Sequence, residues 1–304
     1  MTESKWRKLR RRYSDKVFYM SDTAILVILL ILFAWPLWFM VIASFSNHVA
    51  VTTGKVILWP VDFHFDAYAE MLEYKSFWRG YANTIYVTVV GTAVNMVLTV
   101  CCAYPLSRKD FLPRKPILYY LLIPMYVSGG LIPGYLVVRN LGLLDTYWAM
   151  IIPSAVSYYN CLVVRSYFMH SIPEELQEAA TLDGANAAQY LVKVVLPLSK
   201  PVLAVVGLYY LVGHWNDYYS ALLYIYDKRL YPLQSILKNL LVDAADMGAM
   251  TEGQITAEQM LAKLNRMELL KYSTTIVSIL PILMVYPYVQ KFFVKGVMVG
   301  SVKG

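Results

Sequence analysis

The stretch SIPEELQEAATLDGANAAQYLVKVVLP, Ser171–Pro197, is the most informative part of this sequence, because it is a polar run between two long apolar blocks. The chain has 304 residues, of which 58% are hydrophobic and 15% are charged. Soluble domains contain about 45–50% apolar and about 25% charged residues, so this composition predicts an integral membrane protein. The apolar residues gather in blocks of roughly 20, the length of a membrane-spanning helix, which predicts an all-α fold.

Helix signals within this stretch predict two short helices joined by a turn. Ser171 and Glu174 have the spacing of a capping box, which would start the first helix. Gly184 can take the left-handed backbone conformation that closes a helix. Asn186 can cap a second helix, which we expect to stop at Pro197. We call residues 171–197 the elbow.

Six apolar blocks outside the elbow are long enough to span a bilayer. They are Asp22–Ser44, Asn83–Tyr104, Pro116–Val138, Tyr147–Met169, Val202–Tyr224 and Tyr272–Val289. Six spans place both termini on the same side of the membrane. The second block carries a ladder of polar residues at spacings of three or four, typical of contact between helices. These residues are Asn83, Thr84, Thr88, Thr92, Asn95 and Thr99.

Basic residues predict the orientation of the spans. Seven Lys and Arg lie in KWRKLRRRYSDK, residues 5–16, directly before the first block. Lys and Arg gather on the cytoplasmic side of membrane proteins, so both termini and the elbow are predicted to be cytoplasmic. The first block is longer than the core of a signal peptide and no small-residue cleavage site follows it, so we expect an uncleaved first helix.

The spans divide the chain into segments. We expect a basic cytoplasmic N-terminus at 1–21, a transmembrane domain at 22–294 and a cytoplasmic tail at 295–304. Long external loops are predicted at 46–82 and 225–271. The tail, with two lysines and the ending SVKG, is either a solvated end or a coupling contact.

Several function classes are disfavoured. The net charge of +7 is explained by the basic ends of the spans, so no nucleic-acid partner is expected. The three cysteines lie in apolar blocks and are interpreted as small buried residues rather than metal ligands. No nucleophile–base pair or metal-ligand spacing supports an enzyme, which is the alternative from a different class. No catalytic residue and no metal site are predicted.

The sequence EAATLDGANAAQYLVKVVLP, residues 178–197, resembles the EAA signature of permease subunits of bacterial ATP-driven (ABC) importers. That pattern is E-A-A, a Gly four residues after the second Ala, an aliphatic residue, a spacer and L-P. The matching residues are Glu178, Ala179, Ala180, Asp183, Gly184, Ala185, Val194, Leu196 and Pro197. Val194 stands where Ile is more usual.

Other stretches narrow the resemblance to the maltose-permease class. The ending QKFFVKGVMVGSVKG, residues 290–304, is similar to the tail of the MalG-like subunit, as are ASFSN, SRKDF and WNDYYSALLYI. Among the branches of this class, the chain is most similar to LplC/YtcP-like permeases, which are often linked to oligosaccharides from plant or algal polymers.

The resemblance implies a bacterial plasma-membrane protein with the type I importer permease fold and a division of labour between subunits. The implied partners are a second homologous permease subunit, two ATPase subunits and an external solute-binding lipoprotein. The chain lacks a G-x-x-x-x-G-K-[ST] sequence, so ATP and Mg²⁺ would be held by the ATPase, and this chain would bind no cofactor. In the elbow, Glu178 would be a polar anchor, Ala179 and Ala180 a docking face, and Gly184 the turn.

Polar residues inside two spans are candidates for the substrate path. Hydrogen-bonding groups and aromatic rings suit sugars, and charges within a membrane usually face a cavity or the bundle interior. The candidates are Asn216, Asp217 and Tyr218 in the fifth span and Tyr158, Tyr159 and Asn160 in the fourth. The alternative is structural: hydrogen bonds between helices for the first group and core packing for the second. A permease for another solute, such as a glycerol phosphate or a polyamine, is the alternative to a carbohydrate importer.

Overall fold

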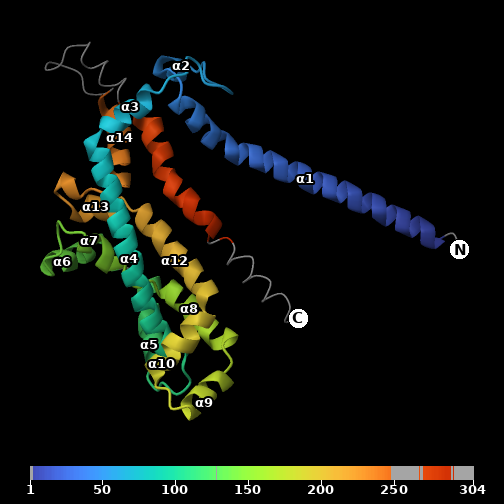
Figure 1. Ribbon diagram of the computed structural model, residues 1–304, viewed down its shortest axis with the longest axis vertical. Coiled ribbons are helices and arrows are strands. Elements are labelled where there is room, and N and C mark those ends of the chain that lie inside the picture. The colour runs from blue at the N-terminus through green and yellow to red at the C-terminus, as the bar shows by residue number, and fades with distance from the viewer. Residues whose placement is uncertain (1–2, 128, 248–266, 268–269, 289, 291–304) are drawn as a thin grey trace. The chain divides into compact units, whose positions relative to one another are not determined.

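The computed structural model describes residues 3–127, 129–247, 267, 270–288 and 290 of the chain. These residues form helices joined by turns and loops, with no strand among them, in agreement with the all-α prediction. The chain divides into two compact units (Figure 1). Unit 1 contains residues 1–73 and 250–276, and unit 2 contains residues 74–249 and 277–304.

Unit 1 begins with a long helix, α1 (Glu3–Ser44), of which Phe18–Ser44 is apolar enough to cross a membrane. Two short helices follow, α2 (His48–Thr52) and α3 (Asp66–Glu73), within the predicted loop at 46–82. The connection is held by packed aromatic rings, with centroids 5.0 to 5.7 Å apart. These rings belong to Phe45, Phe63, Phe65 and Tyr68.

Unit 2 contains most of the remaining helices. In chain order they are α4 (Lys75–Ser107), α5 (Arg114–Tyr126), α6 (Leu131–Asn140), α7 (Trp148–Ile151), η1 (Ile152–Ser154), α8 (Tyr158–Ser171), α9 (Glu175–Leu182), α10 (Ala187–Tyr190), η2 (Leu191–Val195), α11 (Leu196–Leu198), α12 (Lys200–Trp215), α13 (Tyr219–Tyr224), η3 (Lys228–Leu230) and α14 (Leu233–Met247).

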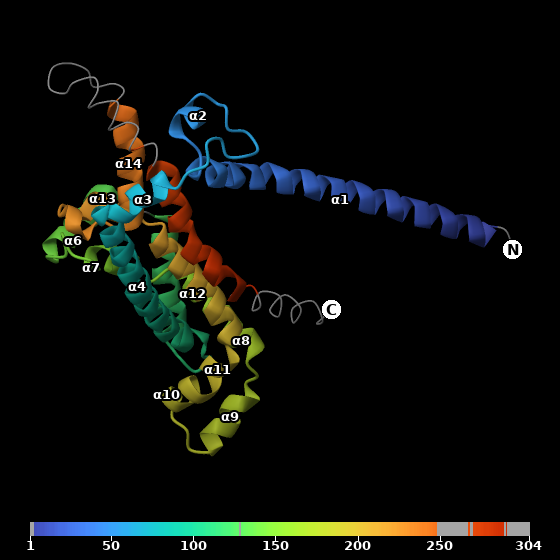
Figure 2. The same cartoon turned by 45° about the horizontal axis from the view of Figure 1, so that its top comes forward.

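Helix α4 is the centre of unit 2, where it packs against α8, α12 and α14. Both views show α4 alongside α12 (Figures 1 and 2). At the end of α4 near the elbow, a buried apolar cluster joins α4, α8, α10 and α12. Its most enclosed members are Ala103, Leu106, Cys161, Val164 and Val206. The elbow is therefore attached to a packed core rather than to an isolated loop.

Three helices are long and apolar enough to cross a membrane among the described residues: Phe18–Ser44, Lys75–Ser107 and Leu270–Tyr288. They coincide with the first, second and sixth predicted spans. Two further pairs of helices meet the same criterion only if each bent pair is counted as one span.

The other three predicted spans are interrupted. In the third, the axes of α5 and α6 differ by 117°. Gly130, directly before α6, has a φ of 87°, which glycine adopts more readily than any residue with a side chain. The fourth is divided into α7, η1 and α8, and the fifth into α12 and α13. Breaks in a spanning segment are tolerated where neighbouring protein satisfies the freed backbone groups.

The described residues of the second predicted external loop, 225–271, include η3 and α14. Within it, Asp227 accepts hydrogen bonds from the backbone and side chain of Arg229. These hydrogen bonds lower the pKa of the Asp227 carboxyl. Residues 248–266 and the predicted tail at 295–304 lie outside the described residues.

Candidate functional site: the elbow at residues 171–197

The elbow begins where α8 ends, and its first helix is not capped as the sequence predicts. Ser171 is the last residue of α8, and α9 starts at Glu175 without a side-chain cap. The capping box from Ser171 to Glu174 is therefore wrong. Ile172 precedes Pro173 and is extended, with φ −110° and ψ 114°, as the proline ring demands of the residue before it. This restriction ends α8 and leaves Glu174 free for another contact.

The turn between the two helices has the predicted glycine at its centre. Gly184 has a φ of 77°, in the left-handed region, and no atom lies within 4 Å of the position of an added Cβ. The Ala185 amide donates to the Ala180 carbonyl at 2.9 Å, and the Gly184 amide donates to the Thr181 carbonyl at 3.0 Å. This pair of bonds is a Schellman motif, which satisfies the last carbonyls of α9. Glycine is required here by the backbone conformation.

The second helix of the elbow is capped by Asn186, as predicted. Its side chain accepts from the Gln189 amide at 2.8 Å, and the Gln189 side chain accepts from the Asn186 amide at 2.9 Å. These two bonds form a capping box one helix later than the predicted one.

The predicted stop at Pro197 is wrong, because the helical path continues to Leu198. Pro197 lies in the first turn of α11. The π-helical turn η2 precedes it and accommodates the hydrogen bond that proline cannot donate. The break comes at Ser199, where the path from Ala187–Leu198 to Lys200–Trp215 bends by 83°.

The two alanines of the predicted docking face point in different directions. Glu178 and Ala179 are exposed, whereas Ala180 is half-buried and packs against the apolar cluster under the elbow. Leu182, one turn further on, is 89% exposed. The outer surface of α9 therefore consists of a carboxylate, a small residue and an exposed leucine. Asp183 caps the end of α9 through its amide, and Leu196 is half-buried.

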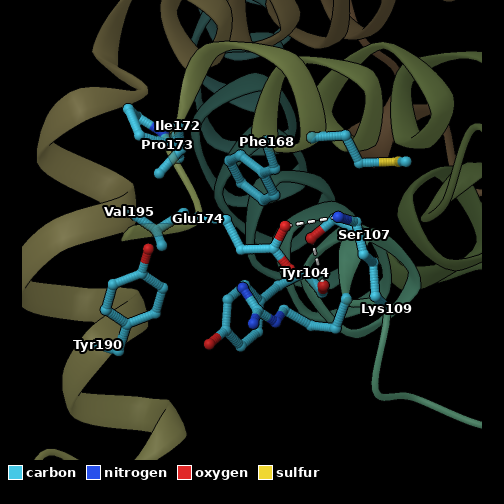
Figure 3. A pocket seen from close by; sticks show the side chains of 11 residues that line it. Tyr104, Ser107, Lys109, Phe168, Ile172, Pro173, Glu174, Tyr190 and Val195 are labelled. Atoms are coloured by element: carbon cyan, nitrogen blue, oxygen red, sulfur yellow. Dashed lines mark hydrogen bonds and ion pairs between the residues drawn. The ribbon is translucent and has the colours of Figure 1, made fainter. Parts of the chain in front are cut away.

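A groove of about 530 Å³ runs between α9 and the loop that joins α4 to α5, residues 108–113, which we call the α4–α5 loop. Charged side chains of both signs border it. They belong to Arg108, Lys109, Asp110, Glu174 and Glu178. Lys109 and Glu174 form an ion pair across a neighbouring pocket, where Figure 3 shows the two side chains pointing toward each other.

Tyr190 forms the buried base of this region and is 4% exposed. The Arg108 guanidinium lies 6.0 Å from the centre of its ring, at the outer limit of a cation–π contact. Burial raises the pKa of the Tyr190 phenol, and the nearby Arg108 charge opposes that rise.

The position of the α4–α5 loop beside the elbow was not predicted. In the sequence, SRKDF, residues 107–111, is only a stretch that is similar to a family. A signal was present: a basic segment directly after the second span, on the predicted side of the elbow. A pairing between residues 65 positions apart cannot be predicted from spacing alone.

The predicted substrate residues of the fifth span lie where α12 gives way to α13. The Asp217 carboxylate accepts from the Ser220 amide at 3.0 Å, so it caps the start of α13. Asn216 donates to the Val212 carbonyl at 3.0 Å within its own helix. Tyr218 is exposed. Both bonds are local, so the structural alternative of hydrogen bonds to neighbouring helices is not seen for Asn216, which is exposed.

The predicted substrate residues of the fourth span lie at the start of α8. Tyr159 is 57% exposed, whereas Asn160 is buried. The Tyr158 hydroxyl lies 3.5 Å from the Leu118 carbonyl, at the limit of a hydrogen bond. Within the described part of the chain, no hydrogen bond joins this group to residues 216–218.

Part of the polar ladder of α4 makes contacts between helices, as predicted, whereas the hydroxyls of Thr88 and Thr92 have no hydrogen-bond partner among the described residues. The Asn95 amide donates to the carbonyls of Ser154 and Ala155, at 2.7 and 3.0 Å, where the fourth span is broken. The Asn95 carbonyl oxygen lies 2.8 Å from Nε2 of His214 on α12. The Thr99 hydroxyl lies 2.7 Å from the hydroxyl of Tyr210. Side chains of α4 thus satisfy backbone groups that the break exposes.

The elbow thus lies between two helices of a packed helical domain. Residues 96–299, which include the elbow, match the family described as "Binding-protein-dependent transport system inner membrane component". The chain belongs to this family of ABC importer permeases.

Curated relatives match over most of their length. The chain is 36% identical to the polygalacturonan/rhamnogalacturonan transport system permease protein YtcP of Bacillus subtilis, over 95% of this chain and 99% of that protein. It is 39% identical to the protein LplC of the same organism, over 88% of this chain and 89% of LplC. At 26% identity it matches MelC, a melibiose/raffinose/stachyose import permease, over 81% of this chain and 84% of MelC.

Solved structures share the fold. A chain from a bacterial ABC transporter involved in import of the acidic polysaccharide alginate superposes with a TM-score of 0.83 and 36% identity, covering 92% of this chain and 98% of that chain. A second chain, from an alginate transporter in complex with its pentasaccharide-bound periplasmic protein, superposes with a TM-score of 0.54 at 16% identity and shows the fold alone.

The chain is therefore the permease subunit of a binding-protein-dependent ABC importer, and it is not the catalytic subunit. It is a multi-pass protein of the plasma membrane.

Proposed function

We propose that this chain is one of two related permease subunits that together form the channel of an oligosaccharide importer. The other members of the complex are two ATPase subunits, which hold ATP and Mg²⁺, and an external solute-binding lipoprotein. The relatives named for sugars or polysaccharides support a carbohydrate substrate. The substrate is taken to be an oligosaccharide because those names include raffinose, stachyose and polysaccharides.

The proposed topology has six spans with both termini and the elbow in the cytoplasm. The basic residues before Phe18–Ser44 support a cytoplasmic N-terminus. The three long helices and the bent pair α5 and α6 support four of the spans that this topology needs. In the second bent pair, Lys200–Trp215 lies in the fifth predicted span, whereas Ala187–Leu198 belongs almost entirely to the elbow.

The elbow is the proposed docking surface for the ATPase, and its turn geometry carries the proposal. The Schellman motif at Gly184 fixes α9 so that Glu178, Ala179 and Leu182 are exposed beside the groove. A partner that binds this surface can pull on α8 and α12, because the elbow is continuous with both helices. Closure of the ATPase subunits would then move the spanning helices.

The proposed substrate path includes the exposed aromatic candidates, Tyr159 and Tyr218. Aromatic faces suit sugar rings, and both side chains are exposed in this subunit. The other four candidates have internal partners or are buried, and their proposed role is to hold the helix breaks in place.

Reconstitution tests the proposal. The chain is placed in liposomes with its co-purifying permease and ATPase, the cognate binding protein is added, and oligosaccharides are screened for stimulation of ATP hydrolysis. We expect an oligosaccharide to stimulate hydrolysis and to accumulate inside. Stimulation by a glycerol phosphate or a polyamine, with none by any sugar, would contradict the carbohydrate assignment.

A further inference from the structure

The elbow is covalently continuous with only two helices of unit 2. Residues 172–174 join α8 to the start of α9, and Ser199 joins α11 to α12. The central helix α4 packs against both α8 and α12, but no peptide connection joins it to the elbow. Any direct link between α4 and the elbow must therefore be made by side chains.

The α4–α5 loop and the last turn of α4 supply such contacts to both halves of the elbow. On the second half, the Tyr104 hydroxyl donates to the Ala187 carbonyl at 3.2 Å, and Arg108 approaches the Tyr190 ring. On the first half, the Lys109 ammonium pairs with the Glu174 carboxylate. Figure 3 shows Tyr104, Lys109, Glu174 and Tyr190 among the side chains that line one pocket.

The two halves differ in how firmly they are held. Tyr190 of α10 is buried in the apolar cluster, whereas the Lys109 and Glu174 side chains are 70% and 54% exposed. An exposed ion pair contributes little to stability and can break and re-form at small cost. Ala180 of the first half also packs against this cluster, but the charged contact of that half is exposed to solvent. The second half is therefore joined to α4 by buried contacts, and the first half by an exposed ion pair.

We propose that Lys109 is a positioning residue for coupling, whose ion pair with Glu174 passes the displacement of α9 to the end of α4. This inference rests on the proposed function of the elbow as the ATPase docking surface. The ion pair adds a direct contact between the start of α9 and the end of α4 to the packing that already joins α4 to α8 and α12.

A charge swap tests the pair. In the reconstituted complex, Lys109→Glu and Glu174→Lys are each expected to lower transport per ATP hydrolysed by about two- to fivefold, the range that the energy of an exposed pair permits. The double change, Lys109→Glu with Glu174→Lys, restores the attraction with reversed signs and should recover most of the loss. The neutral change Lys109→Met removes the ion pair without adding repulsion. It should also lower transport per ATP hydrolysed.

A matched control separates the pair from the local charge. Lys115 is an exposed lysine at the start of α5, in the same basic segment, and it has no ion-pair partner among the described residues. Lys115→Glu changes the charge by the same amount and should leave transport per ATP unchanged. An equal loss in Lys115→Glu, full coupling in Lys109→Met, or a double variant no better than the worse single would each overturn the proposal.

Failure of this inference can be distinguished from failure of the docking assignment. If Gly184→Arg uncouples the complex while all Lys109 variants stay coupled, the elbow docks the ATPase without this contact. If Gly184→Arg itself stays coupled, the docking assignment fails.

Discussion

The elbow and the polar interior of α4 are two functional regions of one bundle, built in opposite ways. Most defining bonds of the elbow join residues within five positions of each other, such as Ala185 to Ala180. The interior of α4 is held by bonds across the fold, such as Asn95 to His214, 119 positions away. The elbow presents exposed small and charged residues, whereas the α4 contacts are buried. The difference shows that the exposed elbow is folded mainly by local hydrogen bonds, whereas the interior of α4 depends on hydrogen bonds between residues far apart in the sequence.

If the interior of α4 is the rigid body, its long-range bonds should dominate stability. Asn95→Leu leaves two backbone carbonyls and the His214 ring without their partner, and we expect it to destabilise the chain by about 3 kcal/mol. Thermal unfolding of the purified complex measures the change.

Thr92→Val is the control on the same helix. The Thr92 hydroxyl is buried without a hydrogen-bond partner in the described part of the chain, so its removal should be neutral or slightly stabilising. Equal losses of stability in Asn95→Leu and Thr92→Val would show that the hydrogen bonds of Asn95 do not stabilise the interior of α4.

Close packing of α4 on α12 gives a smaller expected effect. A Cβ at Gly91 would lie 2.6 Å from Nε2 of His214, which is closer than packed atoms allow. Gly91→Ala should therefore cost about 2 kcal/mol through displacement of the His214 ring. The melting temperature of the complex checks this value.

Gly213, an exposed glycine of α12, is the counterpart of Gly91. It has open space around its Cβ position. Gly213→Ala should be stabilising by up to about 1 kcal/mol, because alanine favours a helix over glycine. Equal changes of the melting temperature in Gly91→Ala and Gly213→Ala would contradict close packing of α4 on α12 at Gly91.

The break between α12 and α13 gives the smallest expected change. Asp217→Ala removes the cap of α13 and should cost about 1 kcal/mol, while Asp217→Asn keeps a capping oxygen and should cost less than half of that. Transport by both variants should stay within about twofold of the parent at saturating substrate. A large loss of sugar affinity in Asp217→Asn would instead place this carboxylate on the substrate path.

Local signals in the sequence predicted much of the elbow. Gly184 and Asn186 behave as their residue types require, because the left-handed turn and the capping box each depend on a few neighbouring residues. The capping box at Ser171 failed since Pro173 restricts Ile172 and so ends α8 instead of starting α9. The amino-acid composition was sufficient to predict an all-α membrane protein. The lengths of the apolar blocks were sufficient to predict the three long helices.

Features that depend on distant partners could not be predicted. The apolar blocks that became α7, η1 and α8 look continuous in sequence, but Asn95 of α4 satisfies the carbonyls at the break. The 83° bend lies at Ser199, two residues after Pro197, and the helix that follows it packs against α4. The ion pair of Lys109 with Glu174 joins two loops whose residues have no common pattern.

The central claim is that the elbow couples this chain to its ATPase, and a pair of matched glycines tests it most directly. Gly184 in the elbow and Gly54 after α2 have φ values of 77° and 71°, and both have open space at the Cβ position. Arginine at either site meets the same backbone strain without a steric clash.

The measurement is binding-protein-stimulated ATP hydrolysis together with solute uptake in the reconstituted complex. We predict that Gly184→Arg lowers uptake by at least about tenfold, whereas Gly54→Arg leaves uptake unchanged. Both changes carry the same backbone strain of about 1–2 kcal/mol, so a loss of stability alone would affect the two variants equally. Stimulated hydrolysis and uptake that both survive Gly184→Arg would contradict the account.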